Sequence, residues 1–284
     1  MERLMGGPAA VDDWCVVTVT FNSAAVLARC WGGTSKPFDW IVVDNGSGDS
    51  SPDVAELLGA RVVRLPRNVG FSAANNIGVR ESTAQYVLFA NPDLNVSGDG
   101  LGRLQAHLDQ YGGLVAPQLL SSTGEVQPNG RGFPYVTAKL GNRNLWPLSR
   151  LHASYRLIAL PGTSTWVAWT IGAAVAARRS DFFALGGWSE RFFLYYEDAE
   201  LGLRAWRNGQ PVAVLGDVRW THHWARATNT FRWSPAHTRE LISANVFYRM
   251  FPEFILGIPN VRKRHALAAS RLGLPVHRVS AAPG

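Results

Sequence analysis

The stretch IVVDNGSGDSSPDVAELLG at residues 41–59 predicts a strand, a polar turn and a short helix in direct succession. Its apolar start, IVVD, is typical of a buried strand, and the DNGSGD that overlaps its end has the residue types that form turns. The helix has serines before its first turn, Pro52 within that turn and Gly59 at its end, which are start and stop signals. Such a unit is characteristic of α/β proteins.

The same unit recurs on both sides of this stretch. Strand patterns occur at 15–21, 60–65 and 86–90, and helix patterns at 24–31 and 72–82. Short apolar strands joined by crossover helices indicate parallel pairing. We therefore predict an α/β fold with a Rossmann-like, mostly parallel sheet flanked by helices. The second half is less regular, with a hairpin expected at 120–127 and a strand at 172–177.

Composition narrows the class of protein. With 284 residues and 46% hydrophobic content, the chain can form a sizeable core. The net charge of +7 favours anionic partners, but no recognition helix, zinc spacing or RNA-binding signature accompanies it, so we expect no nucleic-acid partner. No apolar stretch reaches the roughly 18 residues of a spanning helix, and Cys15 and Cys30 match no disulfide framework. We expect a cytoplasmic protein.

The last part of the chain, 236–284, is expected to form a helical, basic tail. An amphipathic helix pattern covers 237–250, and an apolar segment then leads to the basic cluster RKRH at 262–265. Such a combination can lie on an anionic membrane surface, which would bring the protein to the inner face of the membrane. A terminal helix that packs on the core and leaves its basic end in water explains the pattern equally well.

Polar residues follow each of the first four predicted strands. In parallel sheets ligands bind at the carboxyl ends of the strands, so these loops are candidates for a binding site, although turn chemistry alone explains any single one of them. No phosphate-binding P-loop or hydrolase elbow is present, and GSGDSS is a poor match to a dinucleotide fingerprint. ATP hydrolysis and hydride transfer are therefore disfavoured.

Asp93 follows a buried strand and a proline that fixes the turn. A single carboxylate at a strand end suits Mg²⁺ or Mn²⁺, which complete their shells with water and substrate phosphates. The later motif THHW offers His222 or His223 as a further contact to metal or phosphate, although a histidine pair beside tryptophan is often structural.

Three carboxylates occur in FFLYYEDAELGLR at 192–204. On a helix, Asp198 shares an apolar stripe with Leu194 and Leu201, whereas Glu197 and Glu200 lie at its flanks. A buried carboxylate is costly unless it is paired, which is a reason to suspect function. Acids in a first helical turn also favour the helix dipole, and Asp198 could be an N-cap, so the pattern by itself leaves both readings open.

Six motifs together resemble family 2 glycosyltransferases of the GT-A fold. They are VVTVTFNS, IVVDNGSGD, RNVGFSAANNIG, YVLFANPD, GWSERFFLYYEDAELGLRAWRNG and THHW, and they occur in the order of that family between about residues 16 and 223. Their detailed forms are most similar to bacterial rhamnosyltransferases that build cell-wall or polysaccharide linkers.

The resemblance implies an organisation and a reaction. A GT-A domain would cover 12–235, with a nucleotide-sugar half at 12–117 and an acceptor half at 118–235, followed by the tail at 236–284. A sugar, most simply L-rhamnose from dTDP-L-rhamnose, would move with inversion to a hydroxyl of a lipid-linked or polysaccharide acceptor. Asp198 would be the general base with support from Glu197, and Asp93 with His222 would hold Mg²⁺ or Mn²⁺ on the diphosphate. The implied donor-binding residues are Thr20, Asn22, Asp44, Asn45, Asn68, Gly70, Asn75, Asn91 and Asp93.

Departures from the family pattern keep alternatives open. Asn91 replaces the first acid of the family's D-x-D motif, and Glu200 stands where many relatives have Asp. A UDP- or GDP-sugar transferase would use much the same motifs. A non-catalytic module that binds nucleotide sugars or carbohydrate is a further alternative, disfavoured because Asp93 and Asp198 are both present. A sugar nucleotidyltransferase would need a glycine-rich basic loop that TVTFNSAAV lacks.

Overall fold

The computed structural model describes residues 13–33, 36–141, 155–223, 235–256 and 258–272. The start of the expected domain at residue 12 and the segment after the histidine pair lie outside the described residues.

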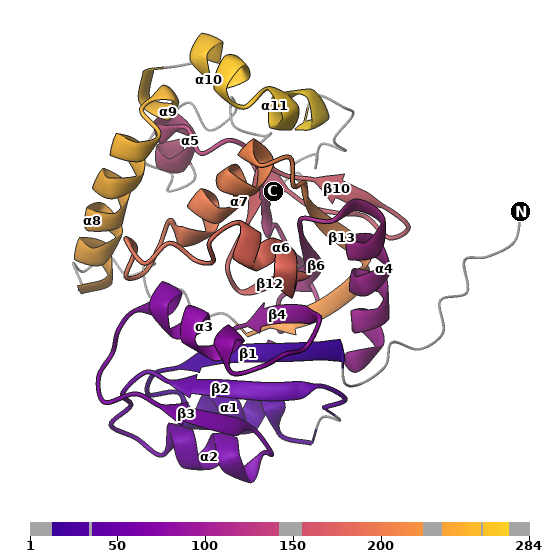
Figure 1. Cartoon of the computed structure of the whole chain (residues 1–284), viewed down its shortest axis with the longest axis vertical. Coiled ribbons are helices and arrows are strands. Elements are labelled where there is room, and N and C mark those ends of the chain that lie inside the picture. Colours follow the sequence, from indigo (N-terminus) through magenta and orange to yellow (C-terminus); the bar gives the residue numbers. More distant parts are fainter. Residues whose placement is uncertain (1–12, 34–35, 142–154, 224–234, 257, 273–284) are drawn as a thin grey trace, which may run out of the picture.

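The first part of the chain forms parallel strands with helices between them (Figure 1). The strands β1, β2, β3 and β4 pair in parallel in the spatial order β4-β1-β2-β3. These strands are β1 (Trp14–Thr20), β2 (Asp39–Asp44), β3 (Arg61–Arg64) and β4 (Tyr86–Ala90). The connecting helices are α1 (Ala24–Trp31), α2 (Ser51–Leu57) and α3 (Phe71–Arg80). The predicted α/β fold and mostly parallel sheet are confirmed.

The second part of the chain extends the same sheet. Beyond β4 the order continues β12, β6, β13 and β10, with β12 antiparallel to both of its neighbours and β13 parallel to β6. These strands are β6 (Leu114–Leu120), β10 (Ser164–Trp166), β12 (Ala174–Arg178) and β13 (Val212–His222). The predicted hairpin joins β6 to β7 (Val126–Gln127). The expected division between residues 117 and 118 falls inside β6, so one sheet runs through both halves.

Smaller elements complete the second part. A separate sheet has the order β11-β8-β9, and β5 pairs with the end of β13. The strands are β5 (Leu94–Asn95), β8 (Gly130–Arg131), β9 (Arg156–Leu157) and β11 (Trp169–Thr170). The helices are the 3₁₀ turn η2 (Gly98–Gly100), α4 (Leu101–Tyr111), α5 (Val136–Gly141), α6 (Arg179–Ala184) and α7 (Glu197–Arg207).

Helices cover both faces of the main sheet because its strands are apolar on both sides. Val16 packs in a cluster with residues of α1, α2 and α4, whereas the next residue, Val17, packs with residues of α3, α6 and α7. Gly78 allows α3 to approach closely, since a Cβ there would lie 2.5 Å from Val17 Cγ1. This close packing holds α3 against β1 and β2.

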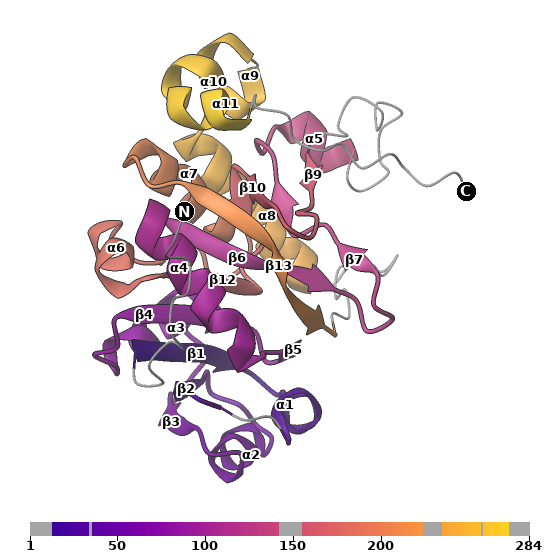
Figure 2. The same ribbon diagram turned by 90° about the vertical axis from the view of Figure 1, so that its right-hand side faces the viewer.

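The C-terminal helices pack against α7. They are α8 (Pro235–Met250), α9 (Glu253–Leu256), α10 (Ile258–Arg264) and α11 (Ala266–Leu272). Phe247, Phe251 and Phe254 form a buried cluster with Ala199 and Leu203 of α7. In both views α9, α10 and α11 lie at the opposite end of the molecule from α1 and α2 (Figures 1 and 2). Among the described residues, no helix has the length and apolarity needed to cross a membrane.

A buried ionic cluster ties the C-terminal helices to the last turn of α7. The Glu253 carboxylate is only 1% exposed and accepts hydrogen bonds from Arg207 (2.8 Å) and Arg264 (3.2 Å), and its Oε1 lies 2.9 Å from His265 Nε2. A buried carboxylate of this kind is held by its partners, and breaking one contact is costly. The C-terminal helices are therefore an integral part of the structure around α7.

Candidate active site

The strand registers bring several predicted polar residues to one edge of the sheet. Thr20 pairs with Asp44, and Asp44 with Arg64, at the carboxyl ends of β1, β2 and β3. Thr20 Oγ1 and Asp44 Oδ1 are buried without a hydrogen-bond partner, while Asp44 Oδ2 accepts the Ser47 N–H (3.1 Å). Buried polar atoms are nearly always satisfied, so two unsatisfied atoms at a strand edge suggest a place for a ligand.

Asn45 and Asn68 use their side chains within the protein. Asn45 Nδ2 donates to Asn68 Oδ1 (3.1 Å) and to the Gly70 carbonyl (3.3 Å), and Asn45 Oδ1 accepts the Val69 N–H (2.8 Å). Gly70 has a φ of 92°, and a Cβ there would lie 2.7 Å from the Phe193 carbonyl. These residues shape the loop before α3 and let the segment before α7 approach it.

Asn22 and Asn75 also make contacts within the protein. Asn22 is exposed with a φ of 53°, and its Oδ1 accepts the Gly48 N–H (2.8 Å), which joins the loops after β1 and β2. Asn75 is 1% exposed, and its Nδ2 donates to the Phe71 carbonyl (3.0 Å). Neither observation tests a role in donor binding, which stays a prediction for these residues.

Asp93 lies opposite His222. Its Oδ1 is 3.4 Å from His222 Nε2 and has no hydrogen-bond partner, and its side chain is 21% exposed. The pairing of β5 with β13 explains this placement, because it sets Leu94 beside His222. His222 Nδ1 lies 3.0 Å from Gln127 Oε1, a contact that our sequence analysis missed because it depends on where the hairpin folds back. The neighbouring histidine donates its backbone N–H to the Asp93 carbonyl (2.9 Å).

Asp93 and His222 fit a divalent ion that needs few protein ligands. Within the described residues there is no group of three or more His, Cys, Asp or Glu side chains that could hold a metal. Mg²⁺ is commonly bound by one or two carboxylates together with water and substrate phosphates. An unsatisfied carboxylate oxygen beside an imidazole nitrogen suits that kind of shared site.

The helix α7 differs from the predicted pattern. It begins at Glu197, with Tyr196 before it in a left-handed conformation (φ 68°), so Leu194 lies outside the helix and Asp198 is not its N-cap. Glu197 and Glu200 are 5% and 3% exposed, and Asp198 is the more exposed residue. The expectation that only Asp198 would be on a buried face is wrong. The reason is that α7 lies between the main sheet and the C-terminal helices, which bury opposite sides of it.

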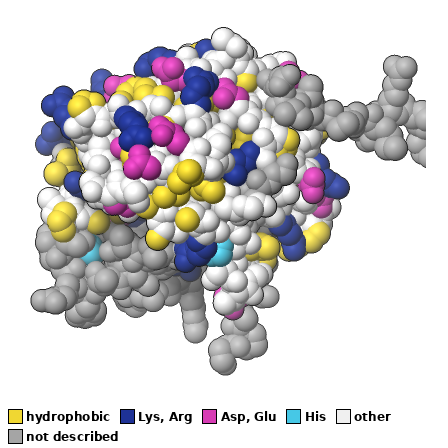
Figure 3. Space-filling model, turned by 90° about the horizontal axis from the view of Figure 1, so that it is seen from below, with side chains coloured by type: hydrophobic (Ala, Val, Ile, Leu, Met, Phe, Trp, Pro, Cys, Tyr) yellow, Lys and Arg dark blue, Asp and Glu magenta, His cyan; other side chains and the backbone are white. Residues whose placement is uncertain are grey.

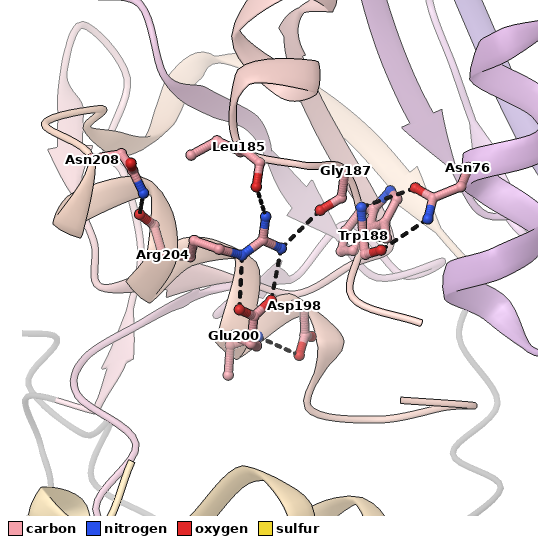
Figure 4. Close-up of polar contacts among 9 residues, drawn as sticks. Asn76, Leu185, Gly187, Trp188, Asp198, Glu200, Arg204 and Asn208 are labelled. Carbon is pink, nitrogen blue, oxygen red and sulfur yellow. Dashed lines mark hydrogen bonds and ion pairs between the residues drawn. The ribbon is translucent and has the colours of Figure 1, made fainter. Parts of the chain in front are cut away.

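Glu200 is engaged in a structural ion pair. It accepts two hydrogen bonds from Arg204, from Nε to Oε1 and from Nη2 to Oε2, both 2.8 Å long. The same guanidinium donates to the carbonyls of Leu185 and Gly187 in the turn after α6 (Figure 4). Asn76 of α3 holds the next residue of this segment, Trp188, because its side chain donates to the Trp188 carbonyl (2.8 Å) and accepts the Trp188 N–H (2.9 Å). Glu200 thus helps to hold α7 against the turn after α6.

Asp198 and Glu197 are neighbouring carboxylates in the first turn of α7. Asp198 Oδ1 accepts the Ala199 N–H (2.8 Å), and Oδ2 accepts the Gly172 N–H (3.2 Å). Burial raises the pKa of Asp198, against which the Lys139 charge acts. Burial and then the Asp198 charge raise the pKa of Glu197 to about 8, and Glu197 Oε2 is buried without a partner. Two such neighbours titrate as a pair, and the pair holds a proton to a higher pH than two ordinary carboxyl groups would.

A short backbone segment connects this pair to the turn after β4. The Gly172 N–H bonds to Asp198, and the carbonyl of the next residue, Ala173, accepts the Asn91 N–H (2.9 Å). A Cβ on Gly172 would lie 3.6 Å from Asp198 Cβ and 3.6 Å from the Phe71 ring. Adjacent residues thus contact Asp198 and the backbone of Asn91, which lies two residues before Asp93.

Comparison with known proteins agrees with this geometry. Residues 15–159 match the family described as Glycosyl transferase family 2. The chain is 30% identical over 240 residues to the N-acetylglucosaminyl-diphospho-decaprenol L-rhamnosyltransferase of Mycobacterium tuberculosis, covering 75% of this chain and 76% of the relative. It is 22% identical over 186 residues to the dTDP-rhamnosyl transferase RfbF of Shigella flexneri, covering 64% of this chain and 58% of the relative.

A solved structure shows the same fold. The mannosyltransferase PcManGT of Pyrobaculum calidifontis, in complex with GDP-Man and Mn²⁺, superposes with a TM-score of 0.58 at 17% identity, over 94% of this chain and 71% of that chain. At this level of identity the likeness concerns the fold alone, which is GT-A. Fold, motif order and sequence similarity agree, and the chain belongs to glycosyltransferase family 2.

Proposed function

We propose that this glycosyltransferase moves L-rhamnose from dTDP-L-rhamnose, with inversion, to a hydroxyl of a lipid-linked or polysaccharide acceptor. The names of the two relatives support the sugar, the donor and the lipid-linked type of acceptor. The observation that carries the mechanism is the short segment in which Gly172 contacts Asp198 and Ala173 contacts the backbone of Asn91, two residues before Asp93.

The donor would lie along the carboxyl ends of β1 to β4. Thr20 and Asp44 supply unsatisfied buried oxygens there, and we assign them to the base and ribose together with Asn22 and Asn45. The loop before α3 and the turn after β4 would line the rest of the donor. The residues assigned to that lining are Asn68, Gly70, Asn75, Asn91 and Asp93. Because Asn45 and Asn68 are engaged with each other, their contribution is chiefly to hold the loop in shape.

Asp93 and His222 would hold Mg²⁺ or Mn²⁺ at the diphosphate. When bound, such an ion neutralises the charge that develops on the departing nucleotide diphosphate. Gln127 keeps the His222 ring in place through its contact with Nδ1, so that Nε2 faces Asp93. This geometry supports His222 rather than His223 as the ligand.

Asp198 would act as the general base. The acceptor hydroxyl attacks the anomeric carbon on the face opposite the diphosphate, the bond from that carbon to the diphosphate oxygen breaks, and Asp198 receives the hydroxyl proton. A carboxylate with a raised pKa is a better proton acceptor near neutral pH than an ordinary one. Glu197 would support it by keeping the proton of the pair, so that Asp198 is the ionised member.

A direct assay tests this proposal. The protein is incubated with Mn²⁺, dTDP-L-rhamnose and a short-chain N-acetylglucosaminyl-diphospho-prenol, and the lipid product is analysed by mass spectrometry. We expect one added deoxyhexose and release of dTDP. UDP- and GDP-sugars are compared in parallel, together with thermal shifts by dTDP, UDP and GDP. Transfer only from a UDP- or GDP-sugar would contradict the donor assignment, and nucleotide binding without any transfer would favour the non-catalytic module.

We also propose peripheral contact with an anionic membrane through the C-terminal helices. Leu241 and Ile242 of α8 are 54% and 61% exposed, and the Arg262, Lys263 and Arg264 side chains of α10 are exposed as well. Apolar and basic side chains together favour an anionic lipid surface. Deleting the tail would remove the Glu253 cluster, so point changes are the better test.

The membrane contact is tested by co-flotation with vesicles. We expect the wild-type protein to float with vesicles that contain anionic lipid and not with neutral ones, and L241E/I242E to lose flotation. Leu57→Glu is a matched control, because Leu57 is 86% exposed on α2, at the other end of the molecule. Equal flotation of L241E/I242E and the wild type would remove α8 from the contact.

A further inference from the structure

A lysine approaches the carboxylate pair of α7 across two aromatic rings. Lys139 is on α5, and its Nζ lies 4.0 Å from the centroid of the Tyr196 ring and 4.8 Å from that of the Trp169 ring. Tyr196 directly precedes Glu197, and both rings are almost completely buried. Cation–π contacts at such distances hold an ammonium group in place while leaving its charge intact. The ammonium group is thereby fixed next to the terminus of α7 that contains Glu197 and Asp198.

The other charged and titratable groups around the pair are engaged differently. Arg131 of β8 donates to the carbonyls of Pro128 and Gly130, and its guanidinium lies 5.9 Å from the Trp169 ring centroid. Burial raises the pKa values of the Tyr155 and Tyr248 phenols far above neutrality, so both stay uncharged.

The Lys139 charge acts on both carboxylates of the pair. It lowers the pKa of Glu197 and that of Asp198. The Arg131 charge lowers the pKa of Asp198 only, and by less than the Lys139 charge does. Two neighbouring carboxyl groups in a buried site share a proton because ionising both is too costly, and a fixed cation makes the first ionisation easier. With Lys139 charged, Asp198 ionised and Glu197 protonated, the group as a whole is neutral.

We propose that Lys139 is a positioning residue, the counter-ion that keeps Asp198 ionised and leaves the proton of the pair on Glu197. The inference deepens the proposed function, since it rests on Asp198 as the general base. It also assigns a role to α5, in a part of the chain where our sequence analysis found only weak local patterns.

The ionisation of the pair can be measured without any activity. Protein labelled with ¹³C at the glutamate carboxyl carbons is titrated by NMR, and Glu197→Gln assigns the Glu197 signal. We expect Lys139→Met to raise the titration midpoint of Glu197 by about one pH unit, because a nearby positive charge is lost, and Lys139→Arg to leave it close to the wild-type value.

Lys36→Met is the matched control. Lys36 also lies over a ring, with its Nζ 5.2 Å from the Trp40 centroid, but at the opposite edge of the sheet, near the start of β2. The substitution Lys36→Met removes the same unit charge and the same type of contact, and we expect it to leave the titration midpoint of Glu197 unchanged. If Lys139→Met does not fold, which its thermal melt will show, Lys139→Gln takes its place. An unchanged midpoint in the neutral Lys139 variant overturns the proposal.

The pH dependence of kcat provides a second measurement. Because Asp198 must be ionised to accept a proton, we expect Lys139→Met to shift the acid limb upward by about one pH unit and to reach a plateau within about threefold of the wild type. A merely structural lysine would lower kcat equally at every pH. If Lys139→Met shifts the Glu197 midpoint but the wild-type protein shows no transferase activity, the counter-ion role of Lys139 is supported and the proposed function is contradicted. If Lys139→Met is active and its acid limb lies at the same pH as that of the wild type, the counter-ion role is contradicted and the proposed function is not.

Discussion

The turn after β4 and the first turn of α7 both present carboxylates at the same edge of the sheet, in opposite environments. Asp93 is partly exposed, and its Oδ1 faces a histidine nitrogen at 3.4 Å. Glu197 is 5% exposed, lies next to another carboxylate and has a buried oxygen without a hydrogen-bond partner. The first arrangement offers lone pairs to a cation, and the second favours retaining a proton. The proposed metal site and the proposed base therefore rest on a difference of environment rather than of residue type.

The largest effect is expected from Asp198→Asn. An amide of the same shape cannot accept the hydroxyl proton, so we expect the transfer rate to fall by about 10³-fold while the affinity for dTDP stays within about twofold. Asp99→Asn, an exposed change of the same chemistry on η2, is the control for both measurements. Full turnover by Asp198→Asn would show that Asp198 is not the general base. The proposed difference in function between α7 and the Asp93 turn would then fail.

The third carboxylate of α7 tests whether burial alone makes a functional group. Arg204→Met would leave Glu200 buried without its ion pair, and we expect a loss of about 3 kcal/mol in unfolding free energy, measured by urea denaturation. Arg64→Met is the control, because its partners Asp53 and Glu56 are exposed, and such pairs contribute less than about 1 kcal/mol. In the view from below, Lys and Arg side chains lie beside Asp and Glu side chains at several places on the surface (Figure 3). Equal losses in the two variants would contradict a structural role for Glu200.

The proposed metal site is tested by nucleotide affinity with and without the ion. We expect Asp93→Asn and His222→Gln to weaken dTDP binding by roughly tenfold in Mn²⁺ and to leave it unchanged in EDTA, measured by isothermal titration calorimetry. His223→Gln is the matched control, because His223 contacts Asp93 through its backbone N–H, which the substitution keeps. Similar losses in EDTA would mean that Asp93 contacts the nucleotide directly.

The fold of the first ninety residues was accessible from sequence because it depends on local signals. Apolar runs, turn residues and helix stop signals predicted α1 and β4 at their observed bounds and the neighbouring elements to within about two residues. The strand edge at which their loops meet followed from the same pattern. Roles for the residues there came from the resemblance and stay predictions.

The surroundings of α7 were not accessible in this way. The C-terminal helices bury a second side of α7 by packing on Ala199 and Leu203, and Glu200 is buried in its ion pair with Arg204. Neither Lys139 nor Gln127 has a local signal that points to its partner, since each meets it only after distant segments pack together. An apolar stripe in a helical sequence predicts one buried face. The prediction is incomplete for a helix that is buried on two faces, as α7 is.

The last expected effect concerns the pH dependence of stability and has a definite sign. In the unfolded chain Glu197 ionises near its ordinary pKa of 4.5, whereas in the folded protein burial and the Asp198 charge raise that pKa to about 8. Between these values the folded state binds more protons than the unfolded state, so rising pH destabilises the fold. Glu197→Gln removes this dependence. We expect the variant to match the wild type at about pH 4.5 and to be clearly more stable than it at about pH 8.5.

Chemical denaturation at a series of pH values measures this difference, with Glu125→Gln as the control because Glu125 is exposed in the β6–β7 turn. If the wild type and Glu197→Gln lose stability in parallel as the pH rises, Glu197 is ionised in the folded protein and holds no proton. The α7 terminus would then present two charges, as a cation-binding site does, and the distinction between it and the Asp93 turn would have to rest on Asp198 alone.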